Sequence, residues 1–185
     1  MKFAKTLLSL AVVGAALSAH AESQLQTGAG ALNATAHLNF SIVVPKVLYL
    51  QVGTGTLAAP SATIDTVNWT LTAAQVGSAA AIAGTPTAAL NARVLANNGN
   101  VTFTATGSGT GLVGPVGSAI IPWTQIVPAA VGALIHPPIT GVAQTVAATS
   151  GVVNQTSVYS FNYSNTNAQM AGTYTGVVTY TASIL

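Results

Sequence analysis

The stretch that decides the fold is AGTYTGVVTYTASIL, at residues 171–185. Apolar and small residues alternate in it with threonine, serine and valine, so that one face carries Tyr174, Gly176, Val178, Tyr180, Ala182 and Ile184. A period of two is typical of a strand that buries one of its faces. The stretch therefore predicts a final β-strand, and such a strand requires a core on which to pack.

Other stretches show the same alternation and predict the strands that supply this core; they are residues 36–44, 47–52, 64–71, 90–96, 101–106 and 157–164, with a weaker one at 145–148. Pro45 separates the first two and indicates an edge or a bend there. About eight short strands without a long helix predict an all-β fold. We expect an antiparallel immunoglobulin-like β-sandwich, with a closed barrel as the alternative.

Two turns predict hairpins. Residues 97–100 read Asn-Asn-Gly-Asn between two alternating runs, a hairpin signal because Asn and Gly tolerate positive φ. Residues 165–171 predict a second hairpin, between the strand at 157–164 and the closing strand. Residues 107–141 are rich in Gly and Pro. The apolar stretch within them, residues 126–139, predicts either a loop that covers the core or an exposed apolar patch for a partner.

The first 21 residues have the pattern of a secretory signal peptide. Lys2 and Lys5 precede an apolar run over 6–18, and Ala19-His20-Ala21 is a cleavage site. The run is too short for a membrane anchor, which needs roughly 20 residues, so no transmembrane segment is expected after cleavage. We expect an exported protein, in the periplasm, at the cell surface or outside the cell. Residues 22–35 would form an N-terminal arm, either flexible or ordered on another subunit's sheet, and residues 36–185 a single domain.

Few charges remain after cleavage. Only Glu22, Lys46, Asp65 and Arg93 are left, and they sum to zero, whereas soluble domains are about 25% charged. No basic patch remains to bind nucleic acid. Low net charge instead favours self-association or binding to other envelope proteins. The chain has no cysteine, so no disulfide stabilises it.

Residues that could carry chemistry are scarce. Glu22 and Asp65 are the only side-chain carboxylates, which argues against a paired-carboxylate glycosidase. His37 and His136 lack the spacing of a metal site, and no G-x-S-x-G motif is present. We therefore expect no enzyme, with no catalytic residue, no metal and no cofactor.

The pattern Gly172-x-Tyr174-x-Gly176-x-Val178-x-Tyr180-x-Ala182 resembles the closing strand of secreted bacterial immunoglobulin-like sandwiches. It is most similar to pilin subunits of the spore-coat-U type, which are assembled by the archaic chaperone–usher route. Residues 33–44, NATAHLNFSIVV, are similar to the arm and first strand of such subunits. The resemblance implies a periplasmic chaperone and an usher as partners, and an arm that completes a neighbour's sheet by strand addition. The subunit contacts would then involve Leu25, Ala29 and Ala31 of the arm, and Tyr174, Val178 and Tyr180 of the closing strand.

Two functions follow from this. The first is a structural protein of the bacterial cell surface, such as a fimbria-like or matrix subunit that assembles by β-strand addition. The second is a monomeric secreted or periplasmic module that binds a carbohydrate or an envelope protein. Its ligand contacts would be an aromatic platform of Trp69, Trp123, Tyr159 and Tyr163, unless these rings are core anchors.

Overall fold

The computed structural model describes residues 23–184 and confirms the all-β prediction: the only helical element among them is one 3-10 turn. The predicted signal peptide and Glu22 lie outside the described residues. The chain divides between Val44 and Pro45 into two units. The elements are β1 (Leu48–Val52), β2 (Val67–Asn68), β3 (Ile82–Ala83), β4 (Thr85–Pro86), β5 (Asn91–Ala96), β6 (Val101–Gly107), β7 (Gly111–Leu112), β8 (Ile121–Pro122), η1 (Trp123–Gln125), β9 (Ile126–Gly132), β10 (Gln144–Val146), β11 (Val153–Tyr163) and β12 (Val178–Ser183).

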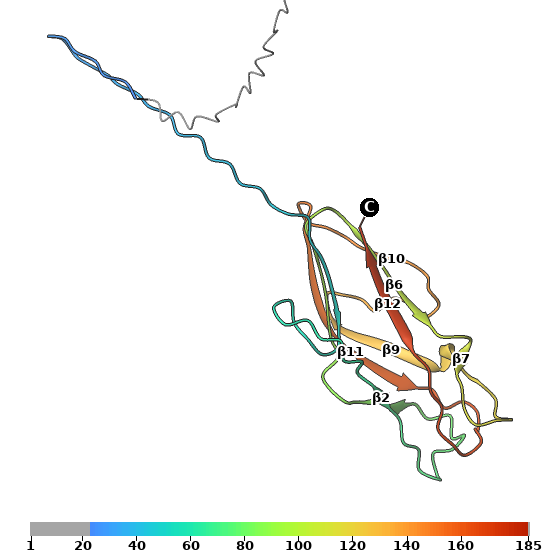
Figure 1. Cartoon of the computed structure of the whole chain (residues 1–185). Helices are drawn as coiled ribbons and strands as arrows, with labels where there is room; N and C mark the ends of the chain where they lie inside the picture. Colours follow the sequence, from blue (N-terminus) through green and yellow to red (C-terminus); the bar gives the residue numbers. More distant parts are fainter. Residues whose placement is uncertain (1–22, 185) are drawn as a thin grey trace, which may run out of the picture. The chain divides into compact units, whose positions relative to one another are not determined.

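The second unit is built on two antiparallel sheets (Figure 1). One has the order β1-β5-β11-β3, with β9 pairing along the opposite edge of β11, and the other has the order β10-β6-β12. Two shorter pairs, β2-β4 and β7-β8, complete the pairing. Val94, Phe103 and Tyr159 come from both large sheets and share one buried core. This arrangement fits a β-sandwich.

The hairpin predicted around residues 97–100 is wrong. The turn exists, with Gly99 at φ +94°, but β5 pairs with β1 and β11 whereas β6 pairs with β10 and β12. The chain therefore crosses from one sheet to the other at this turn. Both strands carry an apolar inward face, Val94 on β5 and Phe103 on β6, and both side chains are fully buried. Because β5 and β6 lie in different sheets, their apolar faces are buried against each other across the core. In a hairpin the two strands would lie side by side in one sheet.

The second predicted hairpin is also wrong, because β11 and β12 belong to different sheets. The closing strand is shorter than predicted and begins at Val178; Tyr174 and Gly176 precede it, and Thr175 forms an isolated bridge with Val113. Within 178–184 the predicted alternation is confirmed, since the residues of one face are half-buried and those between them are exposed.

Residues 107–141 are more ordered than predicted. Strand β9 pairs with β11 along its whole length in spite of Pro128, which is tolerated because β9 is an edge strand. In the segment that follows β9, Leu134, Pro137 and Ile139 are buried in the core. Residues 126–139 thus help to cover the core, as one of the two predictions had it, although residues 126–132 do so as a strand and not as a loop.

The strand predicted at 36–44 is absent from the structure. Residues 36–44 are extended chain assigned to no strand, and their large apolar side chains are exposed: Leu38 by 71%, Phe40 by 86%, Ile42 by 88% and Val44 by 72%. The compact unit begins at Pro45 rather than at residue 36. A strand pattern is present here without the sheet that would bury it. The strand predicted at 64–71 is likewise reduced to Val67–Asn68.

Candidate functional site: an open edge beside β12

The candidate site is the free edge of β12. Among the described residues this strand pairs only with β6. Its inward side chains are only partly buried, and they are Val178, Tyr180, Ala182 and Ile184. On the neighbouring strand β6, the inward Phe103 and Ala105 are fully buried. The core is therefore closed on the β6 side and open along β12.

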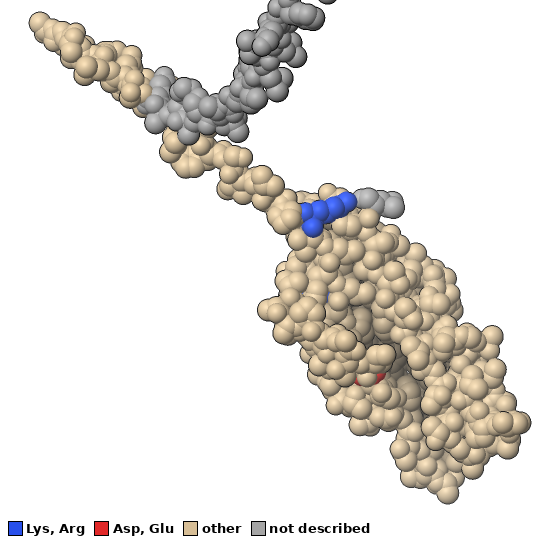
Figure 2. Space-filling view, in the orientation of Figure 1, with Lys and Arg blue, Asp and Glu red and all other residues tan. Residues whose placement is uncertain are grey.

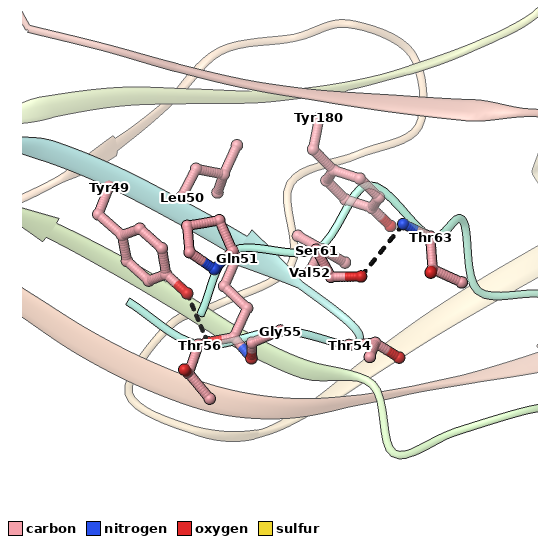
Figure 3. Close-up of a pocket in the computed structure, with 11 residues that line it drawn as sticks. Tyr49, Leu50, Gln51, Val52, Thr54, Gly55, Thr56, Ser61, Thr63 and Tyr180 are labelled. Atoms are coloured by element: carbon pink, nitrogen blue, oxygen red, sulfur yellow. Dashed lines mark hydrogen bonds between the residues drawn. The ribbon is translucent and has the colours of Figure 1, made fainter. Parts of the chain in front are cut away.

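Strand β1 forms the other wall of this opening. Within residues 23–184 it is an edge strand too, paired with β5 alone, and its Leu50 and Val52 pack against the core. A cavity of about 280 Å³ lies between β1 and Tyr180 of β12. Figure 3 shows Leu50 and the Tyr180 ring in the space between the two strands, and the space-filling view shows the surface hollowed there (Figure 2). We call this hollow the β1–β12 groove.

The loop after β1 lines part of the groove. The Gln51 side chain donates through Nε2 to the carbonyl oxygens of Gly53, at 3.0 Å, and of Gly55, at 2.6 Å. Asp65 accepts from the Thr54 backbone N–H at 2.5 Å and from its Oγ1 at 2.7 Å. These bonds hold residues 53–65 beside β1. The loop thus occupies space next to β1, which leaves β12 as the more accessible backbone edge.

His136 supports the floor of the groove. It is 8% exposed, and its Nε2 lies 2.7 Å from the Tyr180 Oη. Its ring meets those of Tyr159, Phe161 and Tyr180 edge-on, at centroid distances of 4.8, 5.3 and 5.4 Å. A groove residue on β12 is thereby fixed to the core by one hydrogen bond and by ring packing. This role of His136 was not predicted from the sequence pattern.

Burial keeps this pair uncharged. Desolvation lowers the pKa of His136 to about 4, and an interaction with the Pro137 backbone opposes part of the shift. Burial, followed by the effect of Tyr159, raises the pKa of Tyr180 well above its usual range. At neutral pH the β12 wall of the groove is therefore uncharged and backed by neutral rings, whereas the opposite wall carries polar side chains such as Gln51, Thr54 and Thr63. The β12 wall can bury apolar side chains without a desolvated charge beneath them.

Two of the four rings predicted as an aromatic platform for ligands are core residues instead, as the alternative had it. Tyr159 and Tyr163 are buried, with 2% and 4% of their surface exposed, so neither offers a face to a sugar. The indole N–H groups of the two tryptophans donate to backbone carbonyls, Trp69 to Ile82 and Trp123 to Ser108, each at 3.1 Å. These four rings anchor the fold, because their positions serve packing and backbone hydrogen bonds.

The residues predicted as subunit contacts fall into two groups. Leu25, Ala29 and Ala31 are exposed and lie outside any strand. Val178 and Tyr180 line the open face of β12, whereas the half-buried Tyr174 lies before that strand and donates to the Met170 carbonyl at 3.1 Å. Residues 38–44 were not predicted to be exposed, since the sequence pattern placed them inside the domain. Pro45, which ends that run, was the signal that separated them.

Among residues 23–184, no three side chains of the His, Cys, Asp and Glu types come together as metal ligands would. Within the same range, no helix is long and apolar enough to cross a membrane. No protein-family model matches the chain, and comparison with curated proteins gave no match.

Proposed function

We propose that this protein is an exported, non-enzymatic structural subunit of the bacterial cell surface that assembles into fibres by β-strand addition. Residues 36–44 of one copy would add a strand at the free edge of β12 in the next copy. One observation carries the proposal: a segment with the alternation of a half-buried strand is exposed, while the compact unit has an open edge with a half-buried apolar face.

The two surfaces are complementary in chemistry. The arm offers Leu38, Phe40, Ile42 and Val44 on one face, all exposed. Burying such a side chain contributes about 1.5–3 kcal/mol, and the added strand would also satisfy the free backbone groups of β12. The inward side chains of β12 carry no charge, so apolar residues can pack against this wall of the groove without desolvating an ion there.

The sheet order supports the more specific assignment. With β1-β5-β11 in one sheet and β10-β6-β12 in the other, the fold fits an immunoglobulin-like sandwich that lacks the strand beside its closing one. This agrees with the resemblance to spore-coat-U and archaic chaperone–usher pilins. In that assignment a periplasmic chaperone covers the groove, and an usher mediates the exchange for the arm of the next subunit.

The donor differs from the one expected from sequence. Leu25, Ala29 and Ala31 are small or irregularly spaced, whereas residues 38–44 combine larger apolar side chains with an alternation that is broken only at Val43. We assign the donor strand to the second set. The binding-module alternative is less well supported, because two of its four aromatic contacts are buried.

A gel of material sheared from producing cells tests the proposal. Without boiling, a denaturing gel probed for this protein should show a ladder that collapses to one band on boiling, because strand-paired subunits resist detergent. Deleting residues 36–44 should remove the ladder while the boiled band remains. A single monomer band for the unaltered chain before boiling would contradict the proposal.

A further inference from the structure

The two ends of the compact unit are formed by different segments of the chain. β1 begins with Leu48 opposite Ala96 of β5, and β12 ends with Ser183 opposite Thr102 of β6. Because residues 97–100 join β5 to β6, the start of β1 and the end of β12 lie at one end of the unit. We call it the turn end; it also carries Val152, which is 45% exposed and pairs with Thr149.

The opposite end is formed by residues 113–120 and 170–177, which we call the tip; it adjoins β7 in Figure 1. Val113 and Thr175 exchange two backbone hydrogen bonds, of 2.8 and 2.9 Å. The Trp123 ring leaves no room for a side chain at Gly176, since an added Cβ would lie 2.8 Å from it. The tip is therefore held by pairing and packing.

The tip is apolar as well as ordered. Its exposed residues are Val113 at 60%, Val116 at 102%, Ile120 at 46%, Met170 at 55% and Val177 at 55%. Figure 2 shows no Lys, Arg, Asp or Glu atoms over it on the face in view. An exposed apolar cluster on an ordered surface is typical of a protein–protein contact.

Chain length determines what can reach this tip. The donor segment ends at Val44 and β1 begins at Leu48, so the connection at 45–47 spans at most about 14 Å. A subunit whose arm fills a neighbour's groove must hold its own turn end close to the point where that arm leaves the groove. If the arm pairs antiparallel to β12, as every pair in that sheet does, it leaves at the tip. Antiparallel pairing is also slightly the more stable per residue.

We propose that the tip is the docking surface for the turn end of the next copy of this chain, so that strand addition builds a head-to-tail fibre with a second contact between subunits. This inference rests on the proposed function, and it names the occupant of the tip. A parallel arm would bring two turn ends together instead and would close a pair of subunits.

Cross-linking the full chain tests the contact, because the chain has no cysteine of its own. A double variant, Val116→Cys with Val152→Cys, places one thiol at the tip and one at the turn end. The control pairs Val131→Cys with Val152→Cys, since Val131 is exposed by 77% but lies on β9 opposite Val158. Assembled material is treated with a short bis-maleimide, boiled and run on a denaturing gel.

The tip–turn variant should give at least about tenfold more cross-linked ladder than the control, because neighbours in a fibre hold two sites at an effective concentration in the millimolar range. A ladder before boiling with no excess of cross-linked product would overturn the tip contact and leave strand addition intact. Cross-linked dimers from Val152→Cys alone would overturn it in favour of turn ends that meet. Absence of any unboiled ladder from the unaltered chain would instead defeat the proposed function.

Discussion

Residues 36–44 and residues 178–184 have the same alternation of apolar and polar side chains but opposite situations. In the first segment Phe40 is 86% exposed and no strand forms. In the second, Tyr180 is partly buried and the strand is paired along one edge. One segment has an apolar face and no sheet, and the other has a sheet with a gap beside it.

This difference shows that alternation predicts that one face of a segment needs to be buried. It does not predict whether the same molecule or another copy supplies the sheet that buries it. A period of two is satisfied equally by a partner strand in the same molecule or in another copy. The charge content supports the second case, since only Lys46, Asp65 and Arg93 are charged among residues 23–184, so little repulsion separates two copies.

The largest effect is expected from a charged substitution in residues 36–44, which should weaken the association between subunits. Phe40→Asp should weaken association between subunits at least about 100-fold, because it loses the burial of a large side chain and places a carboxylate in an apolar groove. Sedimentation of the assembled chain measures the loss. Ser41→Asp is the matched control, since it adds the same charge on the opposite face; equal losses for the two variants would contradict the assigned face.

Acid should destabilise the folded domain through His136, the buried residue behind Tyr180 of β12. The folded pKa of His136 is about 4, against an ordinary value of 6.5, so the unfolded chain binds more protons between these pH values. The free energy of unfolding should be fully present above pH 6.5 and fall by about 3 kcal/mol as the pH drops to 4. Urea titrations at several pH values measure it. His136→Phe should flatten this dependence, and the same slope in both chains would refute the assignment.

A smaller effect is expected from removing the hydrogen bond between Tyr180, in the groove, and His136, in the core. Tyr180→Phe keeps the ring and removes the Oη that lies 2.7 Å from His136 Nε2. The free energy of unfolding should fall by about 1–3 kcal/mol, because a buried nitrogen loses its partner. Chemical denaturation measures the change. Tyr49→Phe is the control, since the Tyr49 hydroxyl bonds at 3.2 Å to a side chain that is itself only part-buried; a cost as large there would argue against a special role for Tyr180.

The smallest expected effect concerns the turn at residues 97–100, where the chain crosses from β5 to β6 and so places β6 beside β12. Gly99 has φ +94° and open space around it. Gly99→Ala should therefore cost about 1–2 kcal/mol through the backbone alone, which lowers the melting temperature by about 2–4 °C per kcal/mol. Asn98→Ala, at the neighbouring position, should change the melting temperature less. An unchanged melting temperature in Gly99→Ala would mean that the turn relaxes freely.

The sequence predicted the strands better than their partners. The inward faces of β5, β6 and β11 follow from alternation, and Val94, Phe103 and Tyr159 are buried accordingly. Pairing could not be predicted, because Asn-Gly serves a hairpin and a crossing between sheets equally well. β9 was missed because proline argues against a central strand but not against an edge. Two residues of the groove, Val178 and Tyr180, were predicted from the closing strand. The exposure of residues 36–44 was not predicted, because their alternation is that of an internal strand.

The most direct test of the central claim mixes two full-length variants. One carries Phe40→Asp, which disables its arm and leaves its groove open. The other keeps its arm and carries a second copy of residues 36–44 after Leu185, joined by a short turn, so that its own groove is filled. Light scattering after size-exclusion chromatography should show a one-to-one complex only in the mixture, because one intact arm meets one open groove. Two monomer peaks in the mixture would contradict strand addition by residues 36–44.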